Sequence, residues 1–202
     1  MTERQATPKK RPYELGKRLE QMDASRAAIL RAAKEQLEAG GYRRLTMESL
    51  AAASGVTRQT IHNLFGTKTG VLEALFDLIA LESGMERMRE VMMSPPGEAQ
   101  IERFVHTFCG MWSKNRVLIR RVHGIAAIEP ELGAVIDARN QRRFVAATRI
   151  MQRMTGEDTA RRAAALAAIT SFEFFDALAE SLGTEAEAEA AVLRLAQNAA
   201  SF

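Results

Sequence analysis

Cysteine and histidine are scarce in this chain of 202 residues. Cys109 is the only cysteine, so no internal disulfide can form and nothing indicates an oxidising compartment. The histidines are His62, His106 and His123, and neither a glycine-rich phosphate loop nor a nucleophile elbow accompanies them. Glu102 and His106 lie one helical turn apart, but such a pair is more often a surface ion pair than a metal site. We therefore expect no catalytic residue, no metal and no cofactor; an all-α enzyme stays open as an alternative.

Aromatic residues are also few, at 6% of the chain, and strand-like alternation and internal repeats are absent. Plentiful alanine favours helices, because β-branched and aromatic residues are the strand formers. No apolar run approaches the ~18 residues that span a bilayer. The first residues are polar and basic, without the apolar core of a signal peptide. The sequence predicts an all-α protein, and we expect it in the cytoplasm.

Charge is unevenly distributed along the chain. Residues 1–72 hold 13 Lys and Arg against 7 Asp and Glu, whereas residues 73–202 hold 15 against 18. A basic first third followed by an acidic remainder indicates that the first part meets a polyanion, although chance clustering of solvated charges would look the same.

Helical periodicity begins at Asp23, and Ile29, Ala33 and Leu37 fall on one face of the first predicted helix. Residues 1–22 lack this periodicity and predict a flexible basic arm, which either contacts DNA or is simply a tail. Glycines at 40 and 41 end the first helix. Further helices are predicted over 46–53, 57–65, 68–93, 98–114, 117–128 and 130–154. One more helix is predicted to begin at a cap formed by Asp158 or Thr159 and to end at residue 182. The last predicted helix covers 185–200.

Residues 46–65 fit a helix-turn-helix on physical grounds. Ala51 is small where two helices cross, and Gly55 stands where the turn needs a positive φ. Val56, Ile61 and Phe65 would fill the shared core. The opposite face of the second helix is then polar, with side chains that match base edges in a major groove: Arg58, Gln59, Thr60, His62 and Asn63. The alternative is an ordinary helical hairpin with a solvated face.

This region resembles the tetracycline-repressor (TetR) family of regulators. The resemblance covers residues 25–76 and is carried by Leu50-Ala51, the run from Ser54 to Ile61, Phe65-Gly66-Thr67-Lys68 and Val71-Leu72. It implies a homodimer of all-α subunits, with a flexible arm at 1–22, a DNA-binding domain at 23–70 and a ligand-binding and dimerisation domain at 71–202. The DNA-contacting residues it implies are Thr46, Thr57, Arg58, Gln59, Thr60, His62, Asn63 and Lys68.

Individual roles follow from the resemblance. Thr57 would cap the recognition helix, and Lys68, at the start of the next helix, would hold a phosphate together with that helix's free N–H groups. The sequence departs from the family pattern at His62, where tyrosine is usual, and at Leu64, where histidine is common. Because leucine cannot donate a hydrogen bond, one backbone contact to DNA is expected to be missing.

The C-terminal part offers a candidate effector pocket and a candidate dimer face. Apolar and aromatic residues at helical spacing either line a pocket or form plain core: Phe104, Phe108, Trp112, His123, Phe172 and Phe175. Methionines 85, 88, 92 and 93 leave the same two interpretations open. The last two predicted helices, rich in alanine, suit a dimeric four-helix bundle. The function expected from sequence is a ligand-responsive regulator, most simply a repressor released from a palindromic operator by a small molecule; a helical protein-interaction scaffold is the alternative.

Overall fold

The computed structural model describes residues 11–40, 44–154 and 159–201. Those residues form helices and no strand, which confirms the all-α fold, and none of the helices is long and apolar enough to cross a membrane. The elements are α1 (Arg11–Glu38), α2 (Met47–Ser54), α3 (Arg58–Phe65), α4 (Lys68–Glu82), the 3-10 turn η2 (Met85–Arg87), α5 (Met88–Met93), α6 (Glu98–Lys114), α7 (Arg116–Ala126), α8 (Pro130–Met154), α9 (Thr159–Ile169), α10 (Phe172–Leu182) and α11 (Glu185–Ser201).

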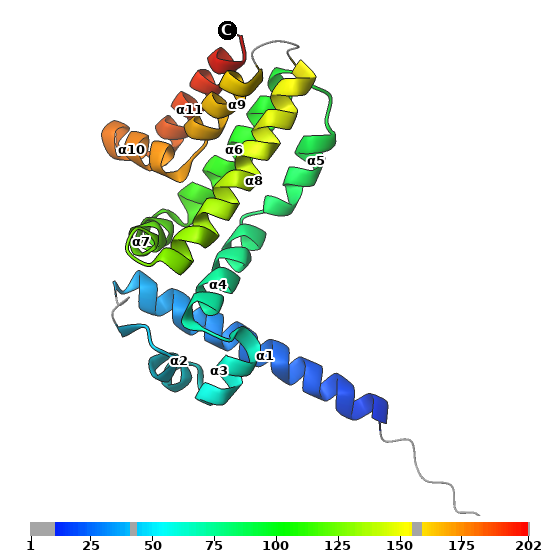
Figure 1. Ribbon diagram of the computed structural model, residues 1–202, viewed down its shortest axis with the longest axis vertical. Coiled ribbons are helices and arrows are strands. Elements are labelled where there is room, and N and C mark those ends of the chain that lie inside the picture. The colour runs from blue at the N-terminus through cyan, green and yellow to red at the C-terminus, as the bar shows by residue number, and fades with distance from the viewer. Residues whose placement is uncertain (1–10, 41–43, 155–158, 202) are drawn as a thin grey trace, which may run out of the picture.

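The molecule has two parts joined along α4 (Figure 1). Helices α1, α2 and α3 make a head at one end, and α6 to α11 make a helical bundle at the other. The head closes over apolar side chains that are almost completely buried, among them Ile29, Leu37, Leu50 and Ile61. The predicted inward face of the first helix is therefore confirmed.

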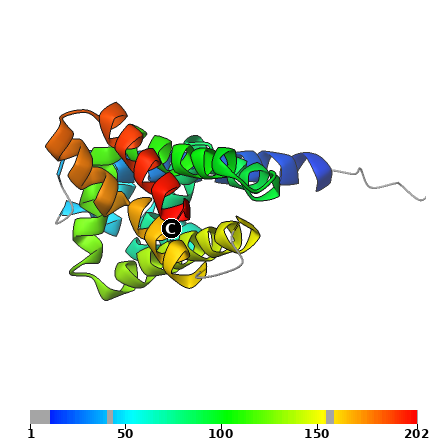
Figure 2. The same ribbon diagram turned by 90° about the horizontal axis from the view of Figure 1, so that it is seen from above.

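The bundle is built on apolar stripes that face one another. Seen from above, α9 and α11 lie between α6 on one side and α8 on the other (Figure 2). The predicted stripe of α6 is buried throughout, from Ile101 and Phe104 to Trp112. Alanines in α9 and α11, such as Ala163 and Ala188, are fully buried and let the helices approach closely.

Helix α1 begins at Arg11, so the flexible arm predicted for residues 1–22 is wrong from residue 11 onward. The missing apolar periodicity reflects a helix without a partner: α1 projects beyond the head, and Leu19 and Met22 are exposed (Figure 1). Lys, Arg, Leu, Glu and Gln are strong helix formers, and they extend the packed half of α1 outward. Residues 1–10 of the predicted arm, like Asp158, lie outside the described residues.

The helix predicted over 68–93 is interrupted, because Gly84 adopts the left-handed conformation at φ 81°. Helix α4 ends at Glu82, and the chain turns through η2 into α5. The hydroxyl of the buried Ser83 accepts a hydrogen bond of 3.1 Å from Asn115 Nδ2, which ties this turn to the end of α6. Sequence periodicity did not reveal the break because apolar residues continue on both sides of it.

The helix predicted to run to residue 182 is also divided, at Thr170 and Ser171. Ser171 caps α10 by accepting the N–H of Phe174 at 3.2 Å. The carbonyl of Thr170 accepts the indole N–H of Trp112 at 3.1 Å. The division therefore turns α10 away from α9 and gives the buried Trp112 its hydrogen-bond partner.

We expect Gly70→Ala to destabilise the protein even though Gly70 lies inside a helix, where alanine normally gains about 1 kcal/mol. A Cβ at Gly70 would lie 2.1 Å from the carbonyl oxygen of Phe65, so α3 and α4 would have to move apart. Overpacking of this kind costs about 1–3 kcal/mol, equivalent to a fall in Tm of roughly 2–12 °C for a chain of this size.

The matched control is Gly16→Ala in the projecting part of α1, where an added Cβ meets nothing within 4 Å. Thermal unfolding followed by circular dichroism should show a Tm for this variant equal to or above that of the wild type. An unchanged Tm for Gly70→Ala would contradict the tight junction of α3 and α4.

Candidate functional site

The turn between α2 and α3 has the geometry that the sequence predicts. Gly55 adopts φ 70°, and its N–H donates to the carbonyl of Ala51 at 3.1 Å, closing α2. Thr46 and Ser49 form a capping box at the start of α2, where each side chain accepts the other's backbone N–H. Thr57 caps α3 by accepting the N–H of Thr60 at 3.1 Å. Caps at both helices hold α3 at a fixed angle to α2.

The outward face of α3 is polar and exposed. Arg58, Gln59, His62 and Asn63 all reach solvent, while Ile61 on the other side of the helix is buried. The amide of Gln59 donates to Asn63 Oδ1 at 2.8 Å. Gln59 and Asn63 can therefore give up this hydrogen bond at the surface and bond to base edges instead.

Arg58 forms an ion pair with Glu48 of α2, at 2.7 Å between Nη1 and Oε1. Both side chains are exposed. The pKa of Glu48 is lowered, first by a hydrogen bond from its own backbone N–H and then by the charge of Arg58. Glu48 therefore stays ionised at neutral pH and holds Arg58 beside the recognition face.

The two departures from the family pattern have different surroundings. His62 is exposed on the outward face, whereas Leu64 is half-buried and packs against the core. Leu64 thus contributes to folding of the head. Lys68 lies half-buried at the first residue of α4, next to the cap in which Thr67 accepts the N–H of Gly70 at 3.1 Å.

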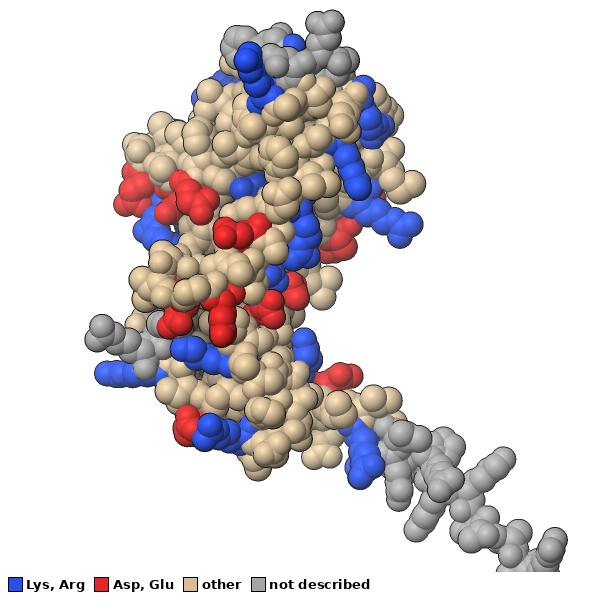
Figure 3. All heavy atoms as spheres, viewed as in Figure 1, with Lys and Arg blue, Asp and Glu red and all other residues tan. Residues whose placement is uncertain are grey.

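An open groove of about 600 Å³ lies between the projecting part of α1 and α3. Arg18, Gln21 and Met22 line it from α1, and Thr60 and Asn63 line it from α3. In the space-filling view, basic side chains occur over the end that carries α2 and α3, and basic and acidic side chains are mixed over the bundle (Figure 3). Arg18 places a positive charge on the groove, which favours an anion there.

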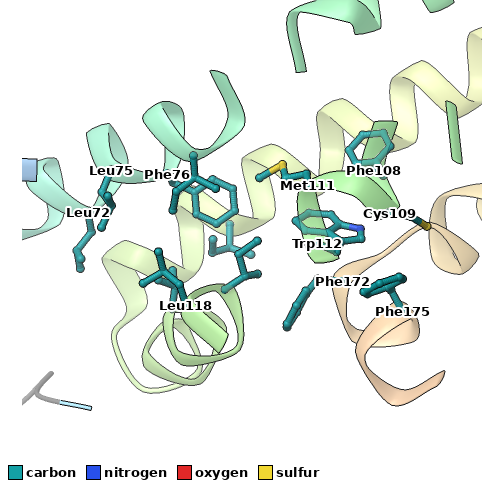
Figure 4. Close-up of a cluster of buried hydrophobic side chains, with 14 of the residues drawn as sticks. Leu72, Leu75, Phe76, Phe108, Cys109, Met111, Trp112, Leu118, Phe172 and Phe175 are labelled. Atoms are coloured by element: carbon teal, nitrogen blue, oxygen red, sulfur yellow. The ribbon is translucent and has the colours of Figure 1, made fainter. Parts of the chain in front are cut away.

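Inside the bundle, the rings of Phe108, Trp112 and Phe172 lie in a row, and Phe175 lies near its end (Figure 4). Ring centroids are 5.0 Å apart from Phe104 to Phe108, 5.9 Å from Phe108 to Trp112 and 5.7 Å from Trp112 to Phe172. The imidazole of His123 lies 4.9 Å from the ring of Phe172, and its Nδ1 donates a 2.7 Å hydrogen bond to the carboxylate of Glu173.

A cavity of about 220 Å³ lies beside this row, between α4, α6 and α8. Of the candidate residues, Phe108, Trp112 and His123 line it, whereas Phe104 and Phe175 are completely buried core. Phe172 packs on Trp112 behind the cavity wall. The remaining lining residues are Phe76, Asp77, Ala80, Met85, Met88, Met111, Ile136, Arg139, Asn140, Arg142, Arg143 and Ala146.

Sequence reasoning missed the polar wall of the cavity, which comes from α8. Arg143 is only 8% exposed and occupies a helical position between Ile136 and Ala147, both of which are buried. A charged residue inside an apolar stripe was the signal that could have found it. Of the methionines, Met85 and Met88 line the cavity, and Met93 is exposed.

Two arginines connect the bundle to the head. Arg139 of α8 lies 4.8 Å above the ring of Phe76 and pairs with Asp77, both on α4. Arg121 of α7 donates to the carbonyls of Leu37 and Glu38 at the end of α1. The bundle therefore contacts the head through α8 on α4 and through α7 on the end of α1.

The remaining candidate chemistry has structural explanations. His106 hydrogen-bonds to Glu189 at 2.7 Å, so the pairing with Glu102 that the sequence raised is not the one observed. Burial raises the pKa of the Cys109 thiol, which stays protonated and unreactive in the core. No group of three or more His, Cys, Asp or Glu suited to a metal occurs in the part of the chain that the structure describes.

Comparison with known proteins gives a consistent result. Residues 29–75 match the family model described as bacterial regulatory proteins, tetR family. A TetR transcription regulator from Haloarcula marismortui superposes with a TM-score of 0.68 at 16% identity, covering 88% of this chain and 96% of that one. A protein from Syntrophomonas wolfei, described as a TetR-family transcriptional regulator, gives 0.71 at 18% identity, with 88% and 95% covered.

A transcriptional regulator from Saccharomonospora viridis, solved in complex with choline, gives a TM-score of 0.58 at 16% identity and covers 83% of this chain and 92% of that one. Among curated proteins, none matches the chain significantly. The resemblance inferred from sequence is confirmed. Residues 29–75 match the tetR family model, and the chain has the all-α fold of solved TetR-family regulators.

Proposed function

We propose that this protein is a ligand-responsive transcriptional regulator, acting as a repressor that binds a palindromic operator as a homodimer and is released by a small molecule. The observation that carries the proposal is the capped, outward-facing polar surface of α3 on a head joined by α4 to a bundle with an internal cavity. A domain of the tetR family reads DNA by placing its recognition helix in the major groove.

The recognition face would divide into residues that read bases and residues that hold phosphates. Arg58, Gln59 and Asn63 can form bidentate contacts to base edges, and Thr60 and His62 add contacts at the same face. Thr46, Thr57 and Lys68 lie at helix N-termini, where free N–H groups and the helix dipole favour phosphate. Arg18, across the groove from α3, would contact the sugar-phosphate backbone.

The cavity supplies the proposed effector site, because its wall includes α4. Phe76, Asp77 and Ala80 of α4 face the same space as α6 and α8. A ligand there would favour one position of α4 over another, and α4 begins two residues after the end of α3. Such a ligand releases DNA only if it binds the conformation with the wrong half-site spacing more tightly. The choline complex of the S. viridis regulator supports a small-molecule site in this fold.

The proposed dimer face lies on the last helices. Their alanines divide into two sets: Ala163, Ala167, Ala179 and Ala188 are buried within the protomer, whereas Ala160, Ala164, Ala168, Ala177, Ala186 and Ala190 are exposed. The exposed apolar side chains of Leu182 and Leu195 lie on the same helices. A second copy would cover this surface and form a four-helix bundle across the two-fold axis.

We expect Arg58→Ala and Lys68→Ala to weaken DNA binding in different ways. The probe is the tightest duplex selected from a randomised pool. Arg58→Ala should reduce preference for that duplex over its single-base variants at one position, by about 1–3 kcal/mol, because a base contact is lost. Lys68→Ala should weaken all duplexes alike and lower the salt slope by about 1, because a phosphate contact is lost.

Fluorescence anisotropy at two salt concentrations measures both effects, and Arg89→Ala, an exposed arginine on α5, is the control. If Arg58→Ala bound every duplex as the wild type does, α3 would not be the reading helix.

Glu48→Gln should strengthen binding to the same duplex by roughly threefold at low salt, because the ion pair that holds Arg58 is removed together with a negative charge that repels phosphate. Glu102→Gln on α6 removes an equally exposed carboxylate far from the head. Anisotropy should show the gain for Glu48→Gln alone, and an equal gain in both variants would indicate a general charge effect.

Ala164→Glu should convert the dimer to a monomer, because it places a charge in the centre of the exposed alanine row of α9. Ala134→Glu, at an exposed position of α8 outside that surface, should leave the assembly unchanged. Sedimentation equilibrium separates the two states. A dimer in both variants would place the interface elsewhere.

A further inference from the structure

We propose that the cavity between α4, α6 and α8 takes a small aromatic carboxylate, with Arg143 as its anchor. This inference rests on the proposed function for the role of the site, and it adds the chemical class of the ligand. The geometry that points to it is a buried guanidinium on the polar α8 wall of the cavity, which faces aromatic and methionine side chains of α4 to α6.

Arg143 is held in place by neutral acceptors. Its Nε donates to the carbonyl of Ala167 at 3.1 Å, and its Nη1 donates to Asn140 Oδ1 at 3.0 Å. Arg143 has no carboxylate partner at ion-pair distance within the described ranges 11–40, 44–154 and 159–201. The acids nearest to the cavity are engaged elsewhere: Asp77 pairs with Arg139, and Glu173 pairs with His123.

Burial of a cation is costly and lowers the pKa of Arg143, and the negative charge of Glu173 opposes that change from beyond ion-pair distance. The guanidinium nevertheless stays protonated at neutral pH. A ligand carboxylate entering the cavity would supply a direct ion-pair partner through charge-assisted hydrogen bonds. The Arg142 side chain, exposed at the rim, adds a second positive charge along the entry path.

Two rings of the cavity wall already have a cation over one face. The guanidinium of Arg143 lies 5.8 Å from the centroid of Phe108, and that of Arg139 lies 4.8 Å from the centroid of Phe76. These two guanidinium groups would repel a quaternary ammonium that came to lie on the same rings.

The volume sets the size of the ligand. At the packing density of protein interiors, a cavity of 220 Å³ holds about ten non-hydrogen atoms, which corresponds to one ring with a short acidic side chain. Met85, Met88 and Met111 line the remaining wall, and their flexible thioethers can adapt to the ring.

The experiment measures binding of three probes of similar shape to the full chain without DNA, by calorimetry. Cinnamate carries the carboxylate, cinnamamide is its neutral counterpart, and phenyltrimethylammonium carries the opposite charge. We expect cinnamate to bind at least about tenfold more tightly than cinnamamide, and phenyltrimethylammonium not to bind. In Arg143→Gln the ratio of acid to amide should fall to near one, whereas Arg142→Gln should keep most of it.

Ala146→Leu keeps Arg143 and fills the cavity from α8, so it should abolish cinnamate binding; this variant decides the matter if Arg143→Gln does not fold. Any of four results would overturn the inference. Cinnamate and cinnamamide could bind equally, or phenyltrimethylammonium could bind more tightly than both. Cinnamate binding could be unchanged in Ala146→Leu, or no probe could bind at millimolar concentration.

Failure of the proposed function is a separate result. Cinnamate that binds as expected but leaves duplex affinity unchanged would refute ligand-controlled DNA release and support the ligand class. If phenyltrimethylammonium lowered the affinity for duplex DNA and cinnamate did not, the aromatic carboxylate would be refuted as the ligand class. That result would support ligand-controlled release.

Discussion

Helix α4 carries one continuous hydrophobic core from the head into the bundle, and the joining of the two parts depends on this. Val71 and Leu72 are buried beside the α1 to α3 core, and Phe76 and Ile79 are buried toward the bundle. A closely packed helix cannot deform gradually, so it moves as a unit between discrete positions. Under the proposed function, a ligand that touches Phe76 would lie fewer than three helical turns of α4 from the end that follows the recognition helix.

Polar contacts also join the bundle to the head. Arg139 holds Asp77 on α4, and Arg121 holds the carbonyls at the end of α1. The second contact also satisfies backbone groups that a helix C-terminus leaves without partners. One contact therefore joins α8 to α4, and the other joins α7 to α1.

The head could be predicted almost completely from the sequence, because its information is local. Thr46 and Thr57 are caps, Gly55 supplies the positive φ, and the spacing of Ile29 and Leu37 defines the buried face. The cavity could not be predicted, because it depends on which helices meet. The aromatic residues indicated the right region, but the breaks at Gly84 and Ser171, and the inward position of Arg143, arise from tertiary packing. The projecting part of α1 was missed because an unpartnered helix has no apolar periodicity.

The central claim is that this chain binds double-stranded DNA through a basic head, and the most direct test is the affinity of the wild-type protein for duplex DNA at two salt concentrations. Fluorescence anisotropy should show measurable binding at low salt and a loss of roughly a hundredfold or more as monovalent salt rises from 50 to 200 mM, because several phosphates are neutralised by lysine and arginine. No duplex affinity at low salt, or an affinity independent of salt, would contradict the claim.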